Sequence, residues 1–136
     1  MTKRLLFDQQ AREAIQHGFD QIARIAQVTL GPVGGVVAVE RTANRDKSPS
    51  MLSDVATIAR RIVELPDTYD NFGAMMARHL AWKVREQEGD GSATALVIAQ
   101  AIIAEANRYI AAGYNSMMLW RGIKKAQLSL LTRLSA

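Results

Sequence analysis

The chain of 136 residues has no cysteine, only three prolines and few aromatic residues, which make up 6% of it. Without cysteine, both a disulfide framework and a thiolate metal site are excluded. The two histidines, His17 and His79, have no second ligand at metal-binding spacing, so we expect both to be ordinary helix residues. The scarcity of aromatics, set against a hydrophobic content of 49%, favours helices packed with Ala, Ile, Leu and Met over a β-sandwich.

Long hydrophobic runs are also missing. The most apolar stretch, 93–106, is interrupted by Thr94, Gln100 and Glu105 and is too short to cross a bilayer. Residues 1–7 lack the long apolar segment of a secretory signal, so we expect a cytoplasmic protein without a membrane partner. The net charge of +4 comes from basic residues scattered among acids, with no basic block interleaved with aromatics. A nucleic-acid partner is therefore not expected.

Apolar residues recur mainly at three- and four-residue spacing, which predicts helices. The first helix is expected to begin at Asp8, as its N-cap, and to end at Leu30, because glycine and proline follow. Gly18 lies inside this helix, which costs up to about 1 kcal/mol relative to alanine and indicates a close packing contact. A short helix is expected after Asp54, its N-cap. Further helices are expected over 70–87, over 92–112 as the central helix of a bundle, and after a cap at Ser116.

Two further patterns complete the predicted fold. The β-branched run 36–40 and the segment 50–53 flank a polar stretch, which predicts a β-hairpin with a long exposed loop. The third helix is expected to bury a stripe made of Phe72, Met75, Met76, His79, Leu80 and Val84. The predicted fold is mainly α, a helical bundle with one β-hairpin, over residues 1–136.

The segment 88–94, Glu-Gly-Asp-Gly-Ser-Ala-Thr, separates two helical patterns. The start of a helix offers unpaired N–H groups and a positive dipole end, which suit a phosphate. Glycine on both sides of Asp90 lets the backbone approach an anion, and Asp90 could hold a phosphate through Mg²⁺. The alternative is an ordinary helix–helix turn in which Asp90 or Ser92 is the N-cap.

Three helix-breaking turns could meet in such a bundle, at 30–32, 53–54 and 90–92. Together they would supply open backbone, two carboxylates and several hydroxyls, which is a plausible pocket for a nucleoside triphosphate. In this interpretation Asp90 carries Mg²⁺ and Asp54 orients or deprotonates the attacking water. The alternative for Asp54 is a helix cap without a catalytic role.

Seven stretches of the chain, in order and over nearly its whole length, resemble the group I chaperonins, the GroEL type. They are T-L-G-P at 29–32 with Gly34, A-R at 59–60 with E-L at 64–65, N-F-G-A at 71–74, G-D-G-S-A-T at 89–94, A-Q-A-I-I at 99–103, A-A-G-Y-N at 111–115 and R-G-I-K-K-A at 121–126. The resemblance implies the N-terminal part of a chaperonin equatorial domain, with the apical, intermediate and C-terminal equatorial parts absent. It implies ATP and Mg²⁺ as cofactors.

Positions matching the family motifs carry the implied roles. Asp54 stands at the position of the acid beside the attacking water, and Asp90 at the position of the metal-binding acid. The implied nucleotide-binding residues are Thr29, Leu30, Gly31, Pro32, Ser53, Asp90, Gly91, Ser92, Ala93 and Thr94.

Departures from the family pattern bear on activity. Val33 and Ser53 replace lysines, Val55 replaces a glycine and Ala93 replaces a threonine. Each lost phosphate contact is worth about 1.5–3 kcal/mol, so nucleotide binding should be weakened. We therefore expect an ATP-binding segment of a folding chaperonin that is not an active ATPase as an isolated chain. The alternative is a non-enzymatic, chaperonin-derived assembly module.

The apolar stripe of the last helix leads us to expect self-association of the chain. Unfolded protein substrates and a co-chaperonin lid are expected as partners only of a full-length chain.

Overall fold

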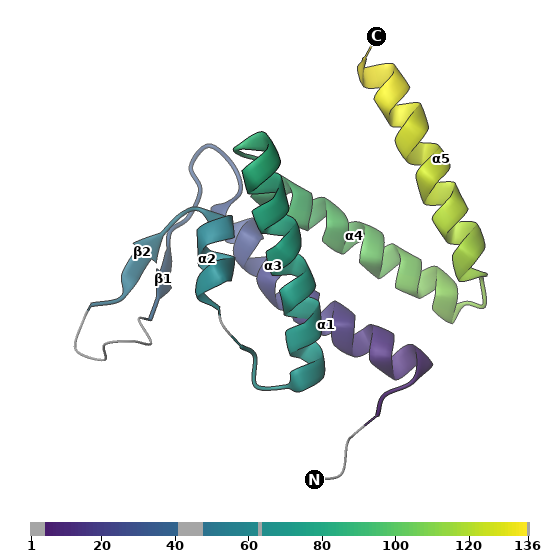
Figure 1. Ribbon diagram of the computed structural model, residues 1–136, viewed down its shortest axis with the longest axis horizontal. Helices are drawn as coiled ribbons and strands as arrows, with labels where there is room; N and C mark the ends of the chain where they lie inside the picture. The colour runs from purple at the N-terminus through teal and green to yellow at the C-terminus, as the bar shows by residue number, and fades with distance from the viewer. Residues whose placement is uncertain (1–4, 41–47, 63, 136) are drawn as a thin grey trace. The chain divides into compact units, whose positions relative to one another are not determined.

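A computed structural model describes residues 5–40, 48–62 and 64–135 (Figure 1). Within these ranges the elements, in chain order, are α1 (Asp8–Thr29), β1 (Val37–Val39), β2 (Ser50–Leu52), α2 (Val55–Arg61), α3 (Thr68–Glu88), α4 (Ser92–Ala111) and α5 (Ser116–Leu134). The fold is mainly α with one antiparallel hairpin, as predicted. The chain forms two compact units, one up to Ala101 and one from Ile102 onward.

Helices α1 and α3 cross in direct backbone contact within the first unit (Figure 1). A Cβ atom on Gly18 of α1 would lie 1.7 Å from the carbonyl oxygen of Asp70. A Cβ atom on Gly73 of α3 would lie 2.0 Å from the carbonyl oxygen of Ile15. Both glycines are buried, so the close contact predicted at Gly18 is confirmed and has a counterpart on the facing helix.

The core of the first unit is formed by α1, α2, α3 and the start of α4, and more than half of its buried apolar residues are alanine. The buried apolar residues are Phe19, Ile22, Ala23, Ala26, Val55, Ala56, Ile58, Ala59, Ala74, Ala77, Ala81 and Leu96. At the rim of the α1–α3 crossing, the carboxylate of Asp70 lies 2.7 Å from Nδ1 of His17 and accepts a hydrogen bond from Gln21. The two closely packed helices thus have small residues at their interface and polar contacts at its edge.

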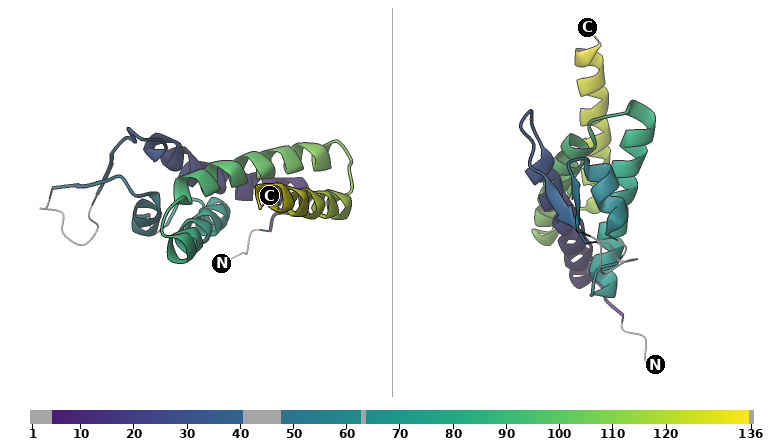
Figure 2. Two further views of the ribbon diagram at one scale, coloured as in Figure 1. Left: turned by 90° about the horizontal axis from the view of Figure 1, so that it is seen from above. Right: turned by 90° about the vertical axis from the view of Figure 1, so that its left-hand side faces the viewer.

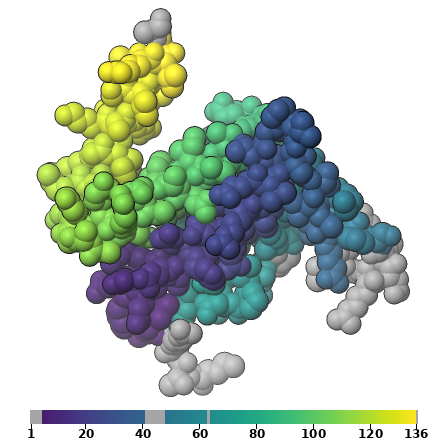
Figure 3. Space-filling model, turned by 180° about the vertical axis from the view of Figure 1, so that it is seen from behind, coloured from purple at the N-terminus to yellow at the C-terminus, as the bar shows by residue number. Residues whose placement is uncertain are grey.

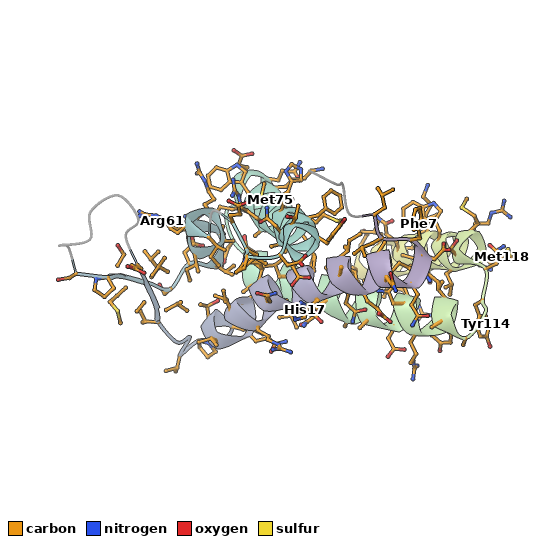
Figure 4. All side chains as sticks on the ribbon, turned by 90° about the horizontal axis from the view of Figure 1, so that it is seen from below. Phe7, His17, Arg61, Met75, Tyr114 and Met118 are labelled. Atoms are coloured by element: carbon orange, nitrogen blue, oxygen red, sulfur yellow. The ribbon has the colours of Figure 1, made fainter. Side chains whose placement is uncertain are left out.

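The prediction that a stripe of large residues forms the buried face of α3 is wrong. Phe72, Met75 and Met76 are 58%, 41% and 46% exposed, and Met75 is labelled in Figure 4. The buried positions of α3 are instead Gly73, Ala74, Ala77 and Ala81. Only small side chains fit where the backbone of α1 comes so close, so the face of α3 that carries them turns inward.

The prediction that α4 is the central helix of the bundle is also wrong. Of its described residues only Ser92 and Leu96 are buried, both in the first two turns, and Ile98 is 55% exposed. Farther along, Gln100 donates a hydrogen bond of 2.9 Å to Asp20 and accepts one of 2.8 Å from Gln27. These contacts hold the first half of α4 beside α1, as the view from behind shows (Figure 3).

The hairpin pairs Val37 with Leu52 and Val39 with Ser50 in antiparallel register. It contacts α1 and α2, which supply the support that an isolated two-stranded hairpin needs. Residues 41–47 of the long loop expected between the strands lie outside the described residues.

Asparagine and aspartate caps fix where three of the helices begin. Asp54 caps α2, as predicted, and Asp67 caps α3. Asn115 caps α5 by accepting hydrogen bonds from the N–H groups of the second and third helical residues, so the cap predicted at Ser116 is wrong by one position. The cap predicted at Asp8 is likewise wrong, because this residue is already helical and Phe7 precedes it.

The second unit contains the later part of α4 and all of α5, joined by a turn in which Gly113 has a φ of 92°. None of the described α5 residues is buried, and Trp120, Leu130 and Leu134 are 51%, 60% and 83% exposed. A shallow groove of about 410 Å³ runs along the start of α5, and its lining includes Tyr114 and Met118 (Figure 4). No helix in the described ranges is both long and apolar enough to cross a membrane.

Candidate functional site

The three helix-breaking turns predicted to form a site lie toward one end of the first unit (Figures 1 and 2). They are the loop after α1, the start of α2 and the turn between α3 and α4. The last two are tied together by an ion pair between Asp54, at the start of α2, and Arg85, in the last turn of α3. The fold thus places the candidate residues on neighbouring elements, although they are far apart in the sequence.

The loop after α1 folds back onto the helix that it ends. The N–H of Gly35 donates a hydrogen bond of 2.8 Å to the carbonyl of Val28, and the hydroxyl of Thr29 donates one of 3.0 Å to the carbonyl of Ala26. Leu30, Gly31 and Pro32 are exposed between these anchors. The loop therefore presents exposed backbone, whereas the Thr29 hydroxyl is engaged within the helix.

The turn between α3 and α4 depends on two glycines in the left-handed region. Gly89 has a φ of 78° and Gly91 a φ of 85°, values that other residues rarely adopt. Between them Asp90 is exposed, and its carboxylate accepts a hydrogen bond of 2.6 Å from the N–H of Gly91. The turn therefore holds one acid at the surface on an ordered backbone.

Ser92, at the start of α4, is 4% exposed, and its hydroxyl donates a hydrogen bond of 2.8 Å to the carbonyl of Ala81. This contact fixes the start of α4 against α3 and directs the hydroxyl into the protein. Thr94 is exposed, and Ala93 is partly exposed. A phosphate at this end of α4 would therefore meet backbone N–H groups of the first turn and the side chain of Thr94.

Both carboxylate oxygens of Asp54 have partners. Oδ2 accepts hydrogen bonds from the N–H and the hydroxyl of Thr57, at 3.1 Å and 2.5 Å, and Oδ1 lies 2.8 Å from Nη1 of Arg85. Partial burial alone would raise the pKa of Asp54, but the hydrogen bonds from Thr57 and the charge of Arg85 outweigh it and lower the pKa below its usual range. Asp54 is a helix cap, and it is also a well-oriented anion.

This lowered pKa predicts how the stability of the fold depends on pH. Asp54→Asn should keep an acceptor for the cap but lose the charge, so at pH 7 we expect a loss of up to about 1 kcal/mol for this half-exposed pair. A group with a lowered folded-state pKa stabilises the fold above its unfolded-state pKa, and this contribution disappears as the pH falls through the folded-state value. Urea unfolding of both proteins over a series of pH values from 7 downward should show a difference that shrinks as the pH falls below the ordinary pKa of an aspartate. A difference that is the same at every pH would contradict the assigned ionic role.

Arg85 was not among the residues predicted for the site. It lies in the last turn of α3, where its carbonyl accepts a hydrogen bond of 3.0 Å from the N–H of Gly89. The nearest sequence signal is a basic residue four positions before a helix-ending glycine, a position that favours cations at any helix C-terminus. Its pairing with Asp54 depends on how α2 packs on α3, and no local sequence pattern predicts this packing.

Asp90 could share a magnesium ion with bound phosphates, whereas a resident metal centre would need more protein ligands. Within the described part of the chain, no group of three or more histidine or acidic residues could hold a metal ion. Mg²⁺ commonly binds through one or two carboxylates and completes its shell with phosphate oxygens and water. The exposed carboxylate of Asp90 at the start of α4 suits this arrangement.

The candidate site lies within a region that matches a known protein family. The model of the TCP-1/cpn60 chaperonin family matches residues 22–136, which contain every candidate site residue.

Proposed function

Because the chain belongs to the TCP-1/cpn60 chaperonin family, we propose that it is the N-terminal portion of an equatorial domain and binds ATP with Mg²⁺. The observation that carries the proposal is the turn between α3 and α4, which places the exposed acid Asp90 two residues before the start of a 20-residue helix. The T-L-G-P motif at 29–32 supports a chaperonin of group I. The activity of the complete protein would be to assist the folding of other proteins.

Each part of the site would have a defined task in binding. The exposed loop 30–32 and the first turn of α4 would offer backbone to the nucleotide and its phosphates. Asp90 would hold Mg²⁺, which when bound neutralises phosphate charge. Asp54 stands where an acid could orient water.

Hydrolysis by this chain is proposed to be negligible. Hydrogen bonds from Thr57 occupy Oδ2 of Asp54, and the lowered pKa makes the carboxylate a weak base. Ala93 has no hydroxyl, and neither Val33 nor Ser53 provides a cation. The chain is therefore proposed to bind ATP without turning it over.

Titration with a fluorescent ATP analogue, with and without Mg²⁺, combined with a phosphate-release assay, tests both statements. We expect saturable binding that is stronger with Mg²⁺, and no phosphate release above the background of the buffer. Turnover that disappears in Asp54→Ala would contradict the second statement. The absence of saturable binding would contradict the first.

A second candidate function is a non-enzymatic assembly module. It is favoured by α5, none of whose described residues is buried although it carries exposed Trp, Met and Leu side chains. Such a surface is typical of sites of protein association. Failure to bind ATP, together with concentration-dependent oligomers in sedimentation velocity, would favour this function over the first.

A further inference from the structure

Arg85 connects the two acidic turns of the candidate site. Its guanidinium lies 2.8 Å from the carboxylate of Asp54, and its backbone carbonyl accepts the N–H of Gly89 at the turn that carries Asp90. Its side chain is 45% exposed, so a ligand can reach it from solvent. The residue thus joins the start of α2 to the end of α3 while part of its charged group stays accessible.

The charges of the site favour an additional cation. Among the candidate residues there are two acids, Asp54 and Asp90, and no basic residue. A nucleoside triphosphate would add several negative charges beside these acids, and Mg²⁺ would offset only part of them. Arg85 is a basic residue that contacts one of these two acids, Asp54.

On the basis of the proposed nucleotide site, we propose that Arg85 is the cation that binds the phosphates there. When no nucleotide is bound, Arg85 instead forms the ion pair with Asp54. A guanidinium carries five N–H donors in a planar fork, which suits phosphate oxygens. The described contact with Asp54 runs through Nη1. The fork can therefore turn toward a phosphate, or bridge the phosphate and Asp54.

Release of Arg85 would not displace Asp54. Thr57 binds Oδ2 of the carboxylate through its N–H and its hydroxyl, whereas Arg85 binds Oδ1. The two contacts use different oxygens, so the cap of α2 remains when the arginine moves. Phosphate binding by Arg85 and orientation of Asp54 are compatible in one site.

The experiment compares Arg85→Ala and Arg85→Lys with Lys83→Ala, a matched control that removes the same charge from an exposed residue of the same helix. Dissociation constants for ATP and for AMP are measured by calorimetry with Mg²⁺ present. Thermal unfolding followed by circular dichroism verifies that each variant is folded. Arg85→Lys keeps the charge and serves as the second variant if Arg85→Ala fails to fold.

For Arg85→Ala we expect a loss of ATP affinity of about tenfold or more, a smaller loss for AMP, and an intermediate effect for Arg85→Lys. Lys83→Ala should change ATP affinity by less than about threefold. If the wild type binds ATP and neither Arg85 variant differs from Lys83→Ala, the role of Arg85 is overturned while the proposed function stands. If the wild type binds no ATP, both are overturned. Equal losses for AMP and ATP would also contradict a phosphate contact.

Discussion

Gly18→Ala is expected to destabilise the protein by about 3 kcal/mol or more, or to prevent folding. A single methyl group at this position would lie 1.7 Å from the carbonyl oxygen of Asp70, so α1 and α3 would have to move apart. Separating them would open the contacts on which the core of the first unit depends. Gly73→Ala, where the methyl group would lie 2.0 Å from the carbonyl oxygen of Ile15, should have a similar effect.

Gly122→Ala is the matched control for this prediction. Gly122 is also inside a helix, but a Cβ atom there would have no neighbour within 4 Å. The same substitution should therefore stabilise α5, by up to about 1 kcal/mol, because alanine favours the helix over glycine. Urea unfolding followed by circular dichroism measures all three variants. A Gly18→Ala protein as stable as the wild type would contradict the close helix crossing.

Asp90→Asn is expected to remove the effect of Mg²⁺ on ATP binding. Asparagine keeps an acceptor for the N–H of Gly91 and suits the turn, but it lacks the charge that a magnesium ion requires. At saturating Mg²⁺ the affinity should fall by about tenfold or more, to the value that the wild type shows without metal. Calorimetric titrations with Mg²⁺ and with a chelator provide the comparison.

Glu88→Gln is the control, because Glu88 is an exposed acid two residues earlier and its substitution changes the charge equally. It should retain the full response to Mg²⁺. A Mg²⁺ response that persists in Asp90→Asn would exclude this carboxylate as the metal ligand. A loss in both variants would indicate a general effect of surface charge.

Local patterns predicted the elements of this fold well. The hairpin strands, the cap at Asp54 and the end of α1 before Gly31-Pro32 all follow from short-range chemistry, since turn residues and caps act within a few positions. The cap of α5 was misplaced because Asn115 and Ser116 are both good caps and adjacent.

Features that depend on packing were predicted poorly. The apolar stripe through Met75 and Met76 has helical spacing, but spacing alone does not show that α1 approaches closely enough to admit only glycine and alanine. The pairing of Arg85 with Asp54 and the inward direction of the Ser92 hydroxyl likewise depend on how α3 packs against α2 and α4. The resemblance to chaperonins predicted which positions form the site. The partners of these side chains became visible only in the three-dimensional structure.

The crossing of α1 and α3 also bears on the order in which the site can form. Docking these two helices joins segments far apart in the chain and closes a loop over residues 30–67, which contains the hairpin and α2. Closing such a loop lowers the entropy of the chain before most of its contacts are made, and this cost grows slowly with loop length. Leu30 and Asp54 lie inside the closed loop, while Asp90 lies outside it. The two halves of the candidate site are therefore brought together by a non-local event, which slows folding relative to a bundle of sequential helices.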